Sequence, residues 1–174
     1  MKVLLTIVGI SIVVLLLLTL LPKSPPAVHA QLDSARMRAL IDALYYRGYD
    51  GGMLVLRVRG DTRFVQLRKE IRAPGSVVLR CDFPLVSWSE PYHSDVKRYL
   101  DSAAVSCSDV PGSGDVPMVE APERTLVIAL GADPNVTEKF VDHVFRKVFG
   151  VDPASRVFGT LESVSPRDTK IGFQ

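Results

Sequence analysis

The residues that could carry acid–base, nucleophilic or metal chemistry are few in this sequence and stand far apart. Its three histidines, His29, His93 and His143, are not at ligand spacing from one another or from a cysteine, so no zinc site is expected. The sequence has no Gly-x-Ser-x-Gly elbow, and neither Cys81 nor Cys107 lies in a catalytic signature. We therefore predict no catalytic residue, no metal site and no cofactor, and we favour a class other than enzyme.

One segment, FPLVSWSEPYH at 83–93, concentrates the aromatic and ionisable residues that a pocket needs. It contains Trp88, Glu90, Tyr92 and His93. These four residues define an alternative function, in which the domain binds or converts a small molecule in a pocket beside them. The competing interpretation is a crossover from a strand to a helix whose tryptophan packs against the edge of the core, which is the commoner role of an aromatic side chain.

A second set of residues alternates along three predicted strands, at 53–59, 62–68 and 76–83. Each strand places apolar residues on one side, so the side chains between them share the opposite face of a sheet. That face mixes apolar groups with arginines, which suits a protein partner, a second copy of the chain or an acidic lipid surface. The alternative is a solvated face whose arginines lie over exposed valines. The predicted partner-binding residues are Arg57, Arg59, Phe64, Arg68 and Arg80.

The distribution of charge gives no argument for nucleic acid. The chain has 21 Lys+Arg and 19 Asp+Glu, and Lys2 and Lys23 are the only charged residues among its first 30. The remainder is therefore neutral, and the basic isoelectric point comes from the flanks of an apolar run. We expect no nucleic-acid partner.

That apolar run, residues 3–21, has no charge and is long enough as a helix to cross a bilayer. We interpret residues 1–22 as a single-pass signal-anchor and 23–31 as a proline-rich linker. A signal peptide cleaved after Ala30 is the alternative. The predicted localisation is therefore the membrane, with the bilayer as a partner through the run; the flanking lysines leave open the side on which the domain lies.

The rest of the chain predicts one α+β domain at 32–165 and a flexible tail at 166–174. Its element order, α-β-β-β-α-β-α, predicts an antiparallel sheet of four to five strands packed by about three helices. The Ser-, Gly- and Pro-rich stretch at 106–123 is predicted to be a loop. Beyond the three strands above, the predicted helices and strands are helices at 32–47, 90–104 and 135–149, a strand at 125–130, and a last short strand at 157–164.

Capping and cysteine chemistry give further expectations. Ser89 is predicted to cap the second helix, and Asn135 with Glu138 to cap the third. Cys81 lies in a strand-like run and is expected to be a small buried hydrophobic residue. A bridge from Cys81 to Cys107 stays open if the domain lies outside the cytoplasm.

The order of these elements resembles a known family. A helix, then RGYDGGMLVLRV, TRFVQLR and VVLRCDF, then a helix, a strand and FVDHVFRKVFGV, is similar to type III secretion chaperone-like domains, including the YbjN-like proteins, over residues 32–150. The resemblance implies a small dimer that binds segments of other proteins and has no catalytic residues. The membrane run departs from that pattern.

Three functional hypotheses follow from these observations. The first is a membrane-anchored, non-enzymatic protein-binding or chaperone-like module. The second is a small-molecule-binding or enzymatic domain, and the third is a structural component of the envelope.

Overall fold

The structure is a computed structural model, which describes residues 34–58, 60–73, 75–112, 122–152, 155 and 157–164. The predicted anchor at 1–22, the linker at 23–31, the tail at 166–174 and Arg59 lie outside the described residues. Within the described ranges, no helix has both the length and the apolar character that crossing a bilayer requires.

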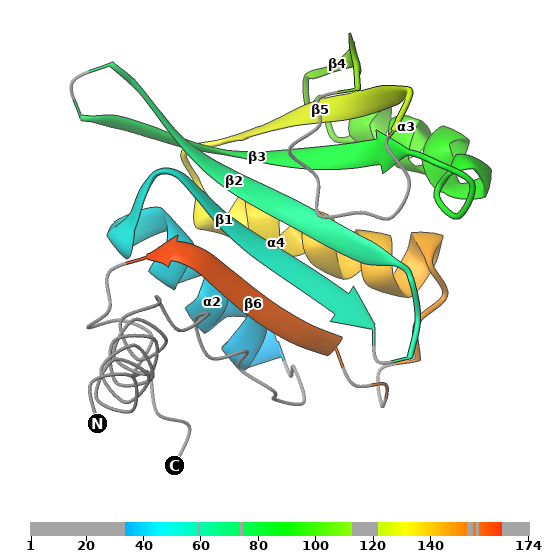
Figure 1. The fold of residues 1–174 in the computed structure, drawn as a ribbon, viewed down its shortest axis with the longest axis horizontal. Coiled ribbons are helices and arrows are strands. Elements are labelled where there is room, and N and C mark those ends of the chain that lie inside the picture. Colours follow the sequence, from blue (N-terminus) through cyan, green and yellow to red (C-terminus); the bar gives the residue numbers. More distant parts are fainter. Residues whose placement is uncertain are drawn as a thin grey trace, which may run out of the picture.

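The described chain is an α+β domain built on one antiparallel sheet (Figure 1), which confirms the predicted fold class. The sheet has six strands in the order β4-β5-β3-β2-β1-β6. Each neighbouring pair is antiparallel. The strands are β1 Gly48–Val58, β2 Phe64–Ala73, β3 Ser76–Leu85, β4 Cys107–Pro111, β5 Arg124–Gly131 and β6 Val157–Val164.

The prediction of four to five strands was wrong because β4 forms within the stretch that was predicted to be a loop. β4 is five residues long and pairs only with β5, at the edge of the sheet. Its side chains are exposed or half-buried, so its sequence lacks the apolar alternation by which a strand is recognised. An edge strand of this kind is held by its neighbour and by polar contacts more than by burial.

Helices α2 and α4 lie on the same side of the sheet (Figure 1). Each helix was predicted, but with different limits. α2 is Ser34–Arg47; a 3₁₀ turn, η1 Glu90–Tyr92, precedes α3 His93–Ser102; and α4 Pro134–His143 continues into a π-helical turn, η2 Val144–Val148.

The capping prediction for Ser89 was right in position only, and the one for Asn135 was wrong. Ser89 is the N-cap residue of η1, but its side chain makes no cap hydrogen bond. Its hydroxyl instead accepts a hydrogen bond from the Val86 amide and donates to the Pro84 carbonyl, so it closes the turn after β3. The N-cap of α4 is Asp133, whose carboxylate accepts from the Asn135 amide at 2.9 Å. Proline at the first helical position, where a missing N–H costs nothing, shifts the cap to the residue before it.

The core fills the space between the helices and the inner face of the sheet. Alternate residues of the strands point into it, as the predicted period of two requires. Its largest fully buried apolar side chains are Phe83, Phe140, Ile41, Leu44, Leu54, Leu56, Leu67, Leu79, Leu100, Leu126 and Ile128.

The register of the sheet separates the two cysteines. Cys81 of β3 and Cys107 of β4 both pair with Ile128 of β5, from opposite sides. Two strand spacings place their Cα atoms about 10 Å apart, beyond the roughly 7 Å that a disulfide can span. Both thiols are free, and Cys81 is fully buried as predicted.

Candidate functional site

The face of the sheet opposite α2 and α4, here called the outer face, gathers the residues that the alternation placed there. Val55 of β1 pairs with Gln66 of β2, and Gln66 pairs with Asp82 of β3. In the next row, Met53 pairs with Arg68, and Arg68 with Arg80. The outer face is defined by Met53, Val55, Arg57, Phe64, Gln66, Arg68, Arg80, Asp82 and Thr125.

The structure describes four of the five predicted partner-binding residues, and all four lie on this face. Arg57 is exposed, and its guanidinium carbon lies 5.8 Å from the centre of the Phe64 ring. Phe64 itself is buried, whereas Arg68 and Arg80 are half-buried. The face therefore has one exposed arginine, Arg57, beside a centre whose side chains are buried or half-buried.

Arginines and carboxylates alternate across the outer face. Asp82 is only 6% exposed and lies between Arg68, whose Nε is 3.3 Å from Oδ2, and Arg80, whose Nε is 3.0 Å from Oδ1. Arg80 also pairs with Glu70, which pairs with Arg72 at 3.0 Å. Each charge at the buried centre thus has an opposite charge beside it, as burial of ionised groups requires.

Hydrogen bonding at this centre is nevertheless incomplete. Among the described residues, eight buried side-chain polar atoms have no hydrogen-bond partner, and six of them belong to the outer face. The two nitrogens that face Asp82 are at ion-pair distance but lack the angles of a hydrogen bond. The six atoms are Gln66 Nε2 and Oε1, Arg68 Nε, Arg80 Nε, Asp82 Oδ1 and Thr125 Oγ1.

Gln66 is the extreme case, because it is 0% exposed and both of its amide atoms are unpartnered. A buried donor or acceptor without a partner costs about 1–3 kcal/mol. The six atoms include both donors and acceptors, which is the pattern that a peptide group satisfies. Such a concentration of atoms on one face is unusual in a folded protein, in which most buried polar groups have a hydrogen-bond partner.

The four residues of the predicted alternative pocket lie in different surroundings. The Trp88 ring packs against Phe64, Phe83 and Phe149, with ring centres 5.1, 6.1 and 6.1 Å away. Tyr92 also packs on Phe149, at 5.1 Å. Glu90 is exposed, and His93 instead faces β4, with its Nε2 3.7 Å from a carboxylate oxygen of Asp109.

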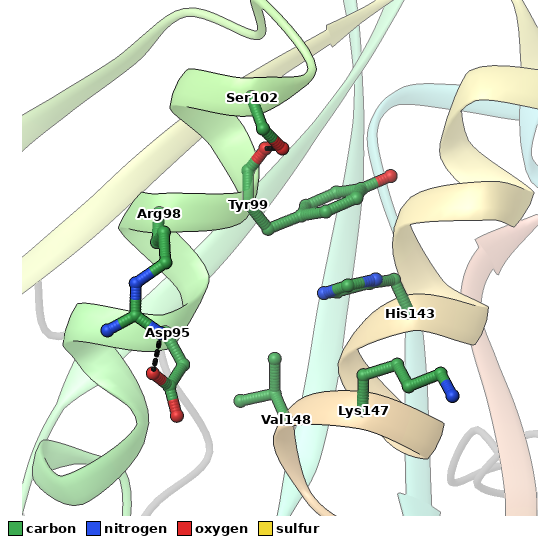
Figure 2. Close-up of a pocket in the computed structure, with 7 residues that line it drawn as sticks. All are labelled: Asp95, Arg98, Tyr99, Ser102, His143, Lys147 and Val148. Carbon is green, nitrogen blue, oxygen red and sulfur yellow. Dashed lines mark hydrogen bonds and ion pairs between the residues drawn. The ribbon is translucent and has the colours of Figure 1, made fainter.

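Figure 2 shows a pocket that the sequence did not predict, between α3 and the end of α4. Its volume is about 390 Å³. The Tyr99 and His143 rings stack with their centres 3.8 Å apart, and Val148 faces α3 below them. The lining residues are Asp95, Arg98, Tyr99, Ser102, His143, Lys147 and Val148.

The surroundings of this pocket favour the uncharged form of both stacked rings. Burial, and then the nearby Lys147, lower the pKa of His143, while burial raises the pKa of Tyr99. The π-helical turn brings Lys147 and Val148 to the pocket, and such turns are frequent at functional sites. Residue periodicity distinguishes a π-turn poorly from an α-helix, so this pocket could not be predicted from the sequence.

Comparison with known proteins assigns the chain to no family. The chain matches no protein-family model, and no curated protein or solved structure is significantly similar to it. Within the described residues, no group of three His, Cys, Asp or Glu side chains is arranged to hold a metal ion. The outer face and the pocket between α3 and α4 are therefore the two candidate sites in the described part of the chain.

Proposed function

We propose that this chain is a membrane-anchored, non-enzymatic protein-binding module whose partner binds at the outer face. The observation that carries the proposal is the set of six buried polar atoms of that face that have no hydrogen-bond partner among the described residues. Three of them, Gln66 Nε2 and Oε1 and Thr125 Oγ1, have no ion-pair partner either. These atoms are shielded from solvent in the chain alone, so a partner reaches them only by displacing what covers them. The N–H and C=O groups of a protein partner could then meet the donors and acceptors together. An inorganic anion would meet the donors alone.

Exposed arginine beside an aromatic ring supports the same proposal. Arg57 lies over Phe64 at the border of the buried centre, and arginine and aromatic residues are the commonest energetic anchors of protein interfaces. The resemblance of residues 32–150 to chaperone-like domains points to the same class of function. A homodimer through this face is one form of it.

The membrane part of the proposal rests on the sequence. Residues 3–21 contain no charged side chain, and a single-pass anchor would hold the domain at a bilayer surface. A tether of this kind raises the local concentration of the domain around partners in the same membrane.

Site-specific photo-crosslinking of the full chain in cells tests the proposed function. A crosslinking amino acid at position 57 should give a discrete protein adduct, or an adduct of two copies if the partner is the chain itself. The same amino acid at position 101, an exposed site on α3, is the control and should give none. Equal labelling from both positions, or no adduct from position 57, would contradict the proposal.

The pocket of Figure 2 favours a second candidate function, the binding of a small molecule between α3 and α4. Its volume is within the usual range for ligand sites, and it carries both aromatic surface and charge. A fragment screen by NMR, read at the Tyr99 and His143 rings, tests this. Lys147→Gln should weaken binding of a ligand in this pocket, whereas Lys139→Gln, outside the pocket, should not. If no fragment gives a saturable chemical-shift change at these rings, small-molecule binding at this pocket is excluded.

A further inference from the structure

Exposed apolar side chains gather at one corner of the domain. Among the described residues, the large hydrophobic side chains that are exposed are Tyr46 at 69%, Tyr49 at 57% and Ile71 at 46%. Tyr46 lies in the last turn of α2, Tyr49 at the start of β1, and Ile71 in the part of β2 that pairs with β3 alone. The hairpin of β2 and β3 projects at the upper left of Figure 1. We call these three residues the tyrosine corner patch.

Hydrogen bonds join the three segments that carry these residues. The ammonium group of Lys69 donates to the carbonyls of Tyr45 and Gly48, at 2.6 and 2.8 Å, and so fastens β2 to the end of α2. The amide of Ile71 donates to the Asp50 carboxylate at 2.9 Å, and so fastens β2 to β1.

A bulge in β1 turns Tyr49 outward. Between the pairs Gly48–Val164 and Met53–Glu162, β1 advances five residues while β6 advances two. The extra residues leave the ladder and project from it. The exposure of Tyr49 thus follows from the path of the backbone in β1.

The composition of the patch suits the interface of a lipid bilayer. Tyrosine combines an apolar ring with a polar hydroxyl and is enriched at the level of the lipid headgroups. Arg72 is exposed beside the patch and pairs with Glu70, while Arg47 and Asp50 are also exposed. With Lys69 included, three positive side chains face two negative ones there, so only one positive charge is in excess, and insertion of the rings should matter more than attraction to anionic lipid.

The length of the chain outside the domain permits this contact. Twelve residues, 22–33, separate the apolar run from α2, and an extended chain of that length spans up to about 40 Å. The patch lies at the far end of α2, whose 14 residues extend about 21 Å. The linker is therefore long enough for the end of α2 that carries the patch to reach the membrane in which the anchor is embedded.

We propose that the tyrosine corner patch rests on the bilayer interface and so fixes the orientation of the domain on the membrane. This inference depends on the membrane anchor of the proposed function. It is independent of the partner, because the patch and the outer face consist of different residues. Docking would leave the domain held at two points, the linker and the corner.

The test uses the full chain in lipid nanodiscs that contain a paramagnetic lipid. We expect loss of the amide NMR signals of Tyr46, Tyr49 and Ile71, while the signals of α3 persist. The variant Tyr46→Ser/Tyr49→Ser/Ile71→Ser should recover the signals of the corner. The control Arg98→Ser/Asp101→Ser/Ala103→Ser, which changes three exposed residues at α3, should leave the loss unchanged.

The outcomes separate the inference from the function on which it depends. If the chain inserts but the corner loses no more signal than α3, docking is wrong and the anchor stands. If the chain does not co-purify with nanodiscs, the anchor and docking are both wrong. Shift changes at the corner that grow with the number of chains per disc, without paramagnetic loss, would assign the patch to a second copy and overturn the proposal.

Discussion

Gln66 lies at the centre of the outer face, where its buried amide lowers the stability of the folded chain. Its side chain is fully buried between Val55 and Asp82, and neither amide atom has a hydrogen-bond partner in the described part of the chain. An apolar residue of similar size would avoid that cost, so stability alone does not explain an amide at this position. Residues that lower stability in this way are common at functional sites.

The first prediction concerns the stability of Gln66→Leu. Leucine removes two buried, unpartnered polar atoms without leaving a large cavity, so we expect the free energy of unfolding to rise by about 1–2 kcal/mol. Urea denaturation followed by circular dichroism measures this. A loss of stability would show that the amide is satisfied in the isolated protein and would remove the main argument for the outer face.

At the scale of elements, β4 depends on a single carboxylate for its attachment to α3. Asp109 of β4 pairs with Lys97 of α3 at 3.1 Å and with Arg124 of β5 at 3.1 Å. His93 also faces it, at 3.7 Å. The hydrogen bond from Lys97, and then the charges of Arg124, Lys97 and His93, lower the pKa of Asp109. This network holds an edge strand that has little apolar surface to bury.

The second prediction is a pH dependence. Because the pKa of Asp109 is lower in the folded than in the unfolded state, its stabilisation is fully present above about pH 4 and is lost as the pH falls through the folded pKa. Asp109→Asn should lower stability by about 1 kcal/mol at pH 7, as expected for a network partly screened by solvent. The difference from the wild type should vanish at the lowest pH.

Urea unfolding at several pH values from neutral to strongly acid measures that difference. Asp101→Asn is the matched control, since Asp101 is an exposed carboxylate on the same helix as Lys97. A difference that stays constant across the acid range would contradict the assignment to Asp109.

The third prediction concerns the two cysteines. Burial raises the pKa of the Cys81 thiol well above its usual value, whereas Cys107 is half-buried on the edge strand. A maleimide should therefore label one cysteine in the folded chain and two after unfolding, and oxidation should form no bridge within the chain. Mass spectrometry under native and denaturing conditions measures both. An intact mass lower by two hydrogens after oxidation would contradict the strand register.

The elements differ in how far the sequence predicts them. Alternation of apolar residues predicted β1, β2 and β3 and the face they share, because a period of two is set by the backbone itself. β4 was missed because an edge strand held by Asp109 has no such period. The depth of Gln66 could not be predicted either, because it depends on which residues of β1 and β3 lie beside it, and these are fixed only by the register.

At the scale of the whole molecule, one sheet presents two unlike surfaces. The inner face packs an apolar core against α2 and α4, while the outer face buries a row of charges and an unpaired amide. Antiparallel sheets often expose one face to water, but a solvated face has no reason to bury polar atoms without partners. The tyrosine corner patch lies at the far end of α2, so a domain docked there would keep the outer face available to a partner.

The fourth prediction joins the outer face to partner binding through a matched pair of variants. Gln66 and Thr137 are both 0% exposed and have unpartnered polar atoms, but Thr137 lies on α4, away from the outer face. Gln66→Leu should therefore reduce binding at the outer face, while Thr137→Val, which also removes a buried polar atom, should not.

The yield of the crosslinked adduct from position 57, compared between these two variants, tests the central claim most directly. We predict that the adduct is lost in Gln66→Leu and retained in Thr137→Val, although both chains are folded. An adduct of equal yield in the two variants would show that the buried amide has no part in binding, and would contradict the assignment of the outer face as the partner site.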